Sequence, residues 1–157
     1  MTGMPARAAT VADAAELTRL RELMLESVGA TVDDVWRAEC RAAFERGLAD
    51  GTYAAFVVDA PDGTSLAACG VASVSQRLPS MTNRSGRVGY IHSMSTDPSH
   101  RRAGHARTVF DAVMAWFAQE GIVTVELHAT DMGAPLYRAY GFAETHYAEL
   151  RWHADDH

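Results

Sequence analysis

The residues best suited to chemistry form one short segment, Met94 to Ala106, which reads Met-Ser-Thr-Asp-Pro-Ser-His-Arg-Arg-Ala-Gly-His-Ala. A strand that ends in a glycine-containing turn before a helix points unpaired backbone N–H groups at one place, the positive end of the helix dipole. Such a place binds anions, above all a phosphate or pyrophosphate. The spacing matches neither GxxxxGK[ST] nor GxGxxG, and an ordinary strand, turn and helix with solvated arginines would show the same pattern.

The elements that must position this segment alternate between strands and helices. We expect strands at 5–9, 53–58, 66–74, 88–96, 122–129 and 142–152, helices at 10–28, 36–48, 106–117 and 133–140, and a polar loop at 76–87. Thr10 followed by Asp13 is typical of a helix start, because the hydroxyl and the carboxylate can cap each other's backbone groups. The order of strand, long helix and strand around 106–117 predicts a parallel strand pair joined by a crossover helix.

The overall composition indicates one globular domain spanning residues 1–157. The chain is 48% hydrophobic and has a formal net charge of −6, which argues against disorder and against a nucleic-acid partner, since an acidic chain repels phosphates. Cys40 and Cys69 lie far apart without a CxxC pattern, so we expect reduced thiols and no metal site. No apolar run is long enough to span a membrane and the N-terminus lacks a signal pattern, so we expect a soluble, cytoplasmic protein without a membrane partner.

Around its arginine and glycine, the segment resembles the central motif of the GNAT superfamily of acyl-CoA-dependent N-acyltransferases. That motif is Arg/Gln-x-x-Gly-x-Gly/Ala after a strand, with a proline three residues before the arginine. Pro98, Arg101, Gly104 and Ala106 match it in register. The run Leu-Tyr-Arg-Ala-Tyr-Gly-Phe at 136–142 resembles the family's LYxxxGF, and residues 9–17 resemble its usual entry into the first helix.

Three positions depart from the family pattern. Thr96 stands where a hydrophobic residue is common, Thr130 where asparagine is frequent, and Gly133 where alanine is usual. Either Thr130 or Asp131 can still cap the short helix that follows.

The resemblance implies the family's fold, a three-layer α-β-α sandwich of the α/β (α+β) class. Its central mixed sheet has about six to seven strands, and strands four and five splay apart.

The resemblance also implies acetyl-CoA as co-substrate. The pyrophosphate of CoA is expected on the N–H groups of residues 102 to 107, and the pantetheine arm along the backbone of Met94 and Thr96. An N–H group of Met94 or Ser95 would polarise the acetyl carbonyl. The expected binding residues are Met94, Ser95, Thr96, Arg101, Arg102, Ala103, Gly104, His105, Ala106, Arg107, Thr130, Gly133 and Tyr137.

Two residues are expected to move protons. Tyr137 matches the family tyrosine that donates to the CoA sulfur, although a buried core tyrosine would look the same. Many relatives carry a glutamate as base where this chain has Tyr90, so we assign the base to His92, which shares the strand face of Tyr90. Arylalkylamine N-acetyltransferases are similar in using histidines at this place. A purely structural His92 is the alternative, and Glu126 and His128 are further candidates.

The predicted function is transfer of the acetyl group of acetyl-CoA to a primary amine of a small molecule or peptide by direct attack. A non-catalytic acyl-CoA sensor on the same fold is the main alternative. A phosphate-binding domain unrelated to CoA is a third, which the LYxxxGF match disfavours. The acceptor stays open, because Arg77, Arg84 and Arg87 suit an acidic substrate whereas the net charge suits a polyamine or aminoglycoside. The resemblance is compatible with a homodimer.

Overall fold

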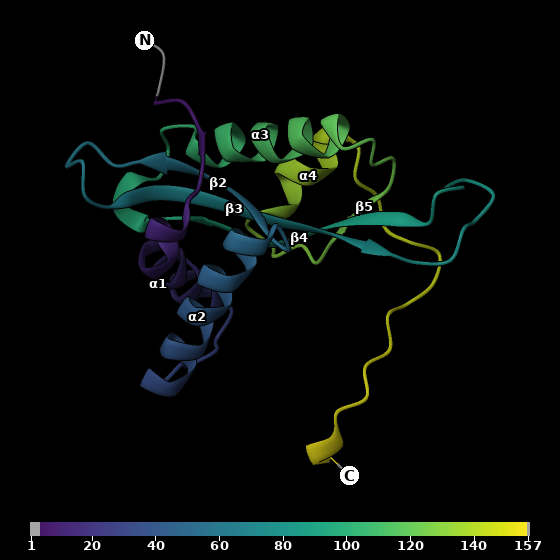
Figure 1. Ribbon diagram of the computed structural model, residues 1–157, viewed down its shortest axis with the longest axis horizontal. Helices are drawn as coiled ribbons and strands as arrows, with labels where there is room; N and C mark the ends of the chain where they lie inside the picture. The colour runs from purple at the N-terminus through teal and green to yellow at the C-terminus, as the bar shows by residue number, and fades with distance from the viewer. Residues whose placement is uncertain (1–3, 157) are drawn as a thin grey trace.

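A computed structural model describes residues 4–156, in which one mixed sheet separates two pairs of helices (Figure 1). Strands β1 (Arg7–Ala8), β2 (Ala54–Asp59), β3 (Leu66–Gln76), β4 (Arg87–Thr96) and β5 (Val125–Leu127) follow one another across the sheet. Every neighbouring pair is antiparallel except β4 and β5, which are parallel. Helices α1 (Ala14–Ser27) and α2 (Asp34–Asp50) cover one face, and α3 (His105–Gln119) and α4 (Ala134–Tyr140) the other. This arrangement confirms the predicted α-β-α sandwich and the crossover by a long helix.

The helices on the first face begin where the sequence places capping side chains. The short 3₁₀ helix η1 (Val11–Asp13) leads into α1, and its Asp13 carboxylate accepts a hydrogen bond from the N–H of Thr10 at 2.8 Å. The Asp33 carboxylate accepts from the N–H of Trp36 at 2.8 Å and so starts α2. Two further 3₁₀ turns, η2 (Pro98–His100) and η3 (Ala154–Asp156), complete the described elements.

Two apolar layers hold the helices on the sheet. On the α1 side, Leu17 and Leu20 pack against strand residues such as Val57, and all three are fully buried. On the α3 side, Phe117 lies so close to Gly89 of β4 that a Cβ on that glycine would lie 2.5 Å from the Phe117 ring. Since protein cores are close-packed, β4 is fixed between both layers and can serve as a rigid support for a site.

Strand β4 contains a β-bulge that changes which side chains share a face. Val71 pairs with Ser93 and Ala72 with Ile91, so His92 is an extra residue between two registered pairs. Ile91 packs in the cluster beneath α3, whereas His92 and Ser93 both face the α1 and α2 layer, where they line one cavity. Strict alternation along the strand would have placed these two neighbours on opposite faces.

The sheet has five strands, fewer than the six to seven expected, and the difference lies at its C-terminal edge. The predicted strand 122–129 pairs only over Val125–Leu127, and 142–152 forms no strand. Figure 1 shows the chain after α4 running away from the sheet, and Tyr147 and Leu150 are 87% and 92% exposed. Alternation of apolar and polar residues predicts a strand only where an edge is present to pair with, and β5 offers a very short one.

The expected splay between strands four and five is present. Strand β5 pairs with β4 only from Gly89 to Ile91, while β4 continues to Thr96. The backbone of β4 beyond Ile91 therefore lacks a strand neighbour on that side.

Both cysteines are free thiols, and burial raises the pKa of the Cys69 thiol to about 12. Among residues 4–156, no helix is both long enough and apolar enough to cross a bilayer.

Candidate active site

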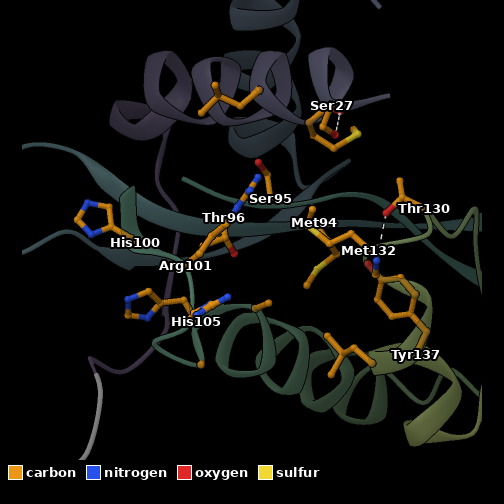
Figure 2. Close-up of a pocket in the computed structure, with 17 residues that line it drawn as sticks. Ser27, Met94, Ser95, Thr96, His100, Arg101, His105, Thr130, Met132 and Tyr137 are labelled. Carbon is orange, nitrogen blue, oxygen red and sulfur yellow. Dashed lines mark hydrogen bonds between the residues drawn. The ribbon is translucent and has the colours of Figure 1, made fainter. Parts of the chain in front are cut away.

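A cavity of about 340 Å³ opens at the C-terminal end of β4, between α1, the start of α3 and the start of α4 (Figure 2). Most of the predicted binding residues line it: Met94, Ser95, Thr96, Arg101, Arg102, Gly104, His105, Ala106, Thr130, Gly133 and Tyr137. Ala103 and Arg107 belong to the same turn and helix start but are not part of the cavity wall. The α1 residues Leu23, Met24 and Ser27, which form the opposite wall, were not among the predicted binding residues. Of these three, only Met24 belongs to the apolar face predicted for the first helix, and nothing in the sequence linked that face to a ligand.

One end of the cavity is a turn built for an anion. Arg102 and Gly104 have positive φ angles of 67° and 78°, and alternating left-handed residues bring successive N–H groups into one concavity. Gly104 caps α3 without a side-chain hydrogen bond, and no acidic residue occupies the first turn. The first N–H groups of α3 therefore keep their donor capacity. The Nδ1 atom of His105 is also buried there without a partner among the described residues.

A network of charges fixes this turn to α1. The carboxylate of Asp97 accepts from the N–H of Ser99 at 2.9 Å and pairs with Arg19 at 2.6 Å. Arg19 is held in turn by Glu16 at 2.8 Å. The Ser99 hydrogen bonds, helped by Arg19, lower the pKa of Asp97 to about 2 against the opposing effect of burial. The turn thus begins at a fixed carboxylate, and its N–H groups are preorganised before any ligand arrives.

The middle of the cavity is the open edge of β4. Figure 2 shows Met94, Ser95 and Thr96 in sequence between α1 and α3. The Ser95 hydroxyl donates to the carbonyl of Leu20 at 2.7 Å, which ties this edge to α1. Because β5 does not pair with this part of β4, its backbone can hydrogen-bond to an extended ligand.

The other end of the cavity is formed by Tyr137 of α4, whose ring projects into the space (Figure 2). The side chain is 8% exposed, and burial raises the pKa of the phenol. No described residue hydrogen-bonds to its hydroxyl. The N–H of Gly133, beneath the ring, donates to the Thr130 hydroxyl at 3.2 Å, so Thr130 holds the turn before α4. Gly133 occupies the N-cap position without a side-chain cap, so neither Thr130 nor Asp131 caps this helix as expected. A protonated phenol thus faces the cavity.

His92 lies outside this cavity and lines a neighbouring one of about 110 Å³ on the α1 and α2 side of β4. Its Nε2 atom is in hydrogen-bond contact with the Ser73 hydroxyl at 2.6 Å, and its ring meets Tyr53 edge-on at 5.5 Å. Burial, with a smaller contribution from the charge of Arg21, lowers the pKa of His92. A lowered pKa keeps the imidazole neutral near pH 7, the form that can accept a proton.

The two further base candidates are engaged elsewhere. Glu126 pairs with Arg77 at 2.6 Å. His128 is hydrogen-bonded through both ring nitrogens, one to the Tyr90 hydroxyl and the other to Glu149. Glu149 was not predicted from the sequence, because its contact with His128 joins residues 21 positions apart. His92 is thus the candidate that lines a cavity and has a lowered pKa.

Comparisons with known proteins agree with this geometry. The model of the acetyltransferase (GNAT) family matches residues 17–142. A predicted acetyltransferase from Clostridium acetobutylicum, solved with acetyl-CoA, is similar at 27% identity, with 95% of this chain and 96% of that one covered and a TM-score of 0.84. A GCN5-related N-acetyltransferase from Ralstonia eutropha JMP134 is similar at 30% identity, covering 96% and 99% of the two chains, with a TM-score of 0.81.

A glucosamine-6-phosphate N-acetyltransferase from Arabidopsis thaliana shares the fold, at 18% identity over 96% of this chain and 99% of that chain, with a TM-score of 0.72. No curated protein matches the chain in sequence. The family model covers most of the chain, and the splayed sheet, the anion-binding turn and the buried tyrosine occur where the resemblance predicts them. The chain belongs to the GNAT family of acetyltransferases.

Proposed function

We propose that this protein transfers the acetyl group of acetyl-CoA to a primary amine of a small molecule or peptide. One observation carries the proposal: a single cavity joins an anion-binding turn, an open strand edge and a buried protonated tyrosine. These are the three features needed to hold a pyrophosphate, an extended amide-containing arm and a leaving sulfur. The similar protein from Clostridium acetobutylicum, solved with acetyl-CoA, supports the choice of donor.

The residues present fit this donor. The N–H groups of residues 102–107 and the buried Nδ1 atom of His105 would hold the pyrophosphate, with the exposed Arg101 and Arg102 adding positive charge. The β4 backbone at Met94 and Thr96 would pair with the pantetheine arm. When bound, acetyl-CoA supplies an activated thioester. The chain's own task is then to position the acceptor amine and to handle two protons.

Each proton has a candidate group. An N–H of Met94 or Ser95 would polarise the acetyl carbonyl, and Tyr137, which keeps its proton at neutral pH, would donate to the departing sulfur. His92, with its lowered pKa, would accept a proton from the substrate ammonium directly or through water. Ser93, which lines the His92 cavity, and Met94, which lines the larger one, are neighbours on β4.

The test is a calorimetric titration of the purified chain with acetyl-CoA, using ATP and NAD as controls. Selective binding, followed by thiol release when amines are added, would support the proposal. Selective binding without thiol release for any amine in a broad panel would favour the non-catalytic sensor. No binding by a folded sample, with folding checked by circular dichroism, would refute the proposal.

A further inference from the structure

The smaller cavity, beside β4, has a chemical character of its own. It lies between α1, α2 and the sheet, and Arg21, Phe44, Tyr53, His92 and Ser93 are among its lining residues. Its volume of about 110 Å³ approaches that of the apolar cavities of about 150 Å³ that bind benzene. The space suits one small branched or aromatic group.

Arg21 brings an uncompensated cation to this cavity. One guanidinium nitrogen donates to the carbonyl of His92 at 3.1 Å, and no carboxylate of residues 4–156 lies within ion-pair distance of it. Its charge acts on the neighbouring side chains. Burial and, after it, the charge of Arg21 lower the pKa of His92, and the same charge partly offsets the burial that raises the pKa of Cys40. A partly buried arginine whose remaining donors point to no protein anion is well suited to a carboxylate ligand.

Ser93 adds a second polar group that lacks a partner. The residue is 3% exposed, and its hydroxyl makes no hydrogen bond within the part of the chain that the structure describes. Leaving a buried hydroxyl unsatisfied is costly, which points to a ligand atom as its partner. The β4 bulge explains its position, since it turns Ser93 and His92 to the same cavity.

The other walls are apolar or aromatic. Ala43 and Phe44 contribute from α2, Val71 from β3, and Tyr53 from the segment before β2. Phe44 and Tyr53 lie with ring centroids 6.4 Å apart. An apolar group buried among these side chains contributes binding free energy in proportion to its buried apolar area. A polyamine or an aminoglycoside would instead place further positive charge beside Arg21.

We infer that this cavity binds the acceptor and selects an amino acid with a compact apolar side chain, whose carboxylate meets Arg21 and Ser93. The inference rests on the proposed function. With its side chain beside Phe44 and Tyr53, the amino acid presents its amine along β4 toward the larger cavity. The amine nitrogen forms a bond to the acetyl carbon as the carbon–sulfur bond breaks. His92 takes the ammonium proton before attack, and the sulfur leaves as a thiol with the proton of Tyr137. The second proton, lost from the nitrogen as the amide forms, returns through water to the Tyr137 phenolate.

The test compares leucine with 3-methylbutylamine and phenylalanine with 2-phenylethylamine, pairs that differ only in the carboxylate. Thiol release from acetyl-CoA gives kcat/KM for each compound. We expect the amino acid to exceed its amine by at least about tenfold, the usual effect of a charge-assisted hydrogen bond. Equal values, or a preference for the amines, would overturn the inference.

Arg21→Gln should remove this preference: kcat/KM for leucine should fall by at least about tenfold more than kcat/KM for 3-methylbutylamine, with both measured at a pH where His92 is neutral in the variant and in the wild type. Arg41→Gln is the matched control, since Arg41 is exposed on α2 and forms an ion pair with Glu45 on the same helix. If Arg21→Gln fails to fold, Ser93→Ala is the second variant. It should lower kcat/KM for leucine more than kcat/KM for 3-methylbutylamine. An equal loss for leucine and the amine in either variant would contradict carboxylate recognition.

Leucine is also titrated into the protein by calorimetry, which separates this inference from the proposed function. Heat of leucine binding that is lost in Arg21→Gln supports the acceptor site even if acetyl-CoA does not bind. Acetyl-CoA binding with neither leucine nor phenylalanine bound or acetylated overturns the inference and leaves the proposed function in place. Absence of acetyl-CoA binding refutes the function alone.

Discussion

The ring of Tyr137 lies directly against the backbone of Gly133, four residues earlier in the chain. A Cβ added at Gly133 would come within 2.8 Å of the ring carbon Cε2 and 3.1 Å of the hydroxyl oxygen. The resembled motif usually has alanine at this position, so the glycine is a specific feature of this chain. It lets the phenol settle on the turn that Thr130 holds, and it thereby sets where the hydroxyl points.

Replacing Gly133 with alanine should therefore displace the Tyr137 ring. Overpacking typically costs about 1–3 kcal/mol, and we expect a loss of that size in the free energy of unfolding, measured with urea. If the hydroxyl also moves from its working position, kcat should fall by about tenfold. The double variant Gly133→Ala, Tyr137→Phe should lose no more kcat than Tyr137→Phe alone. Additive losses would show that Gly133 acts independently of the tyrosine.

Tyr137→Phe removes only the hydroxyl and keeps the ring in its contacts with Phe110 and Phe142. Because the buried phenol stays protonated at neutral pH, we expect its loss to lower kcat by about 10²- to 10⁴-fold, the range of acid–base catalysis. Calorimetric affinity for acetyl-CoA should stay within a few-fold of the wild type. Tyr140→Phe is the control, since Tyr140 packs on Phe110 but is 53% exposed. A matching kcat loss in both variants would contradict the assignment.

Gly104→Glu places a negative charge at the cap of α3, where an anion is expected to bind. We expect affinity for acetyl-CoA to fall by more than about 100-fold, through repulsion and through strain at a φ of 78°. Gly63→Glu is a close control, because Gly63 has a φ of 75° and open space around it but lies in the β2–β3 turn. It reports the strain without the charge effect at the site. Similar affinities for acetyl-CoA in the two variants would contradict the assignment of pyrophosphate binding to this turn.

The pH dependence of kcat/KM tests His92. Burial and Arg21 hold the pKa of His92 below its ordinary value, so the imidazole is neutral and able to accept a proton above that pKa. The rate should fall only as the pH drops below about 6.5, the ordinary value for histidine. His92→Gln should lower kcat/KM and remove this acidic limb. Arg21→Gln should move the limb to higher pH, because a positive charge that opposes protonation is lost. An unchanged limb in His92→Gln would exclude His92 as the base.

Most of the fold was predictable from local patterns. The apolar stripe over 106–117 became α3, the Pro and Gly turn at 59–63 became the β2–β3 hairpin, and Thr10 with Asp13 formed the expected cap. These features depend on residues close together in the chain, whose side chains and backbone settle the local conformation. The predicted strand 142–152 was wrong because strand formation depends on a partner edge elsewhere, which the residues themselves do not specify.

The same distinction applies to the site. The turn between β4 and α3 could be predicted from the sequence alone, because Arg101, Gly104 and the start of α3 are contiguous and their geometry is local. The sequence also predicted Tyr137 and His92 as the residues that move protons, a prediction that the variants above test. No local pattern indicated that a bulge turns His92 and Ser93 to one face, or that Arg21 of α1 meets them there; both depend on how the elements pack. That contact joins residues 71 positions apart, and it forms only when helix packing brings α1 onto β4.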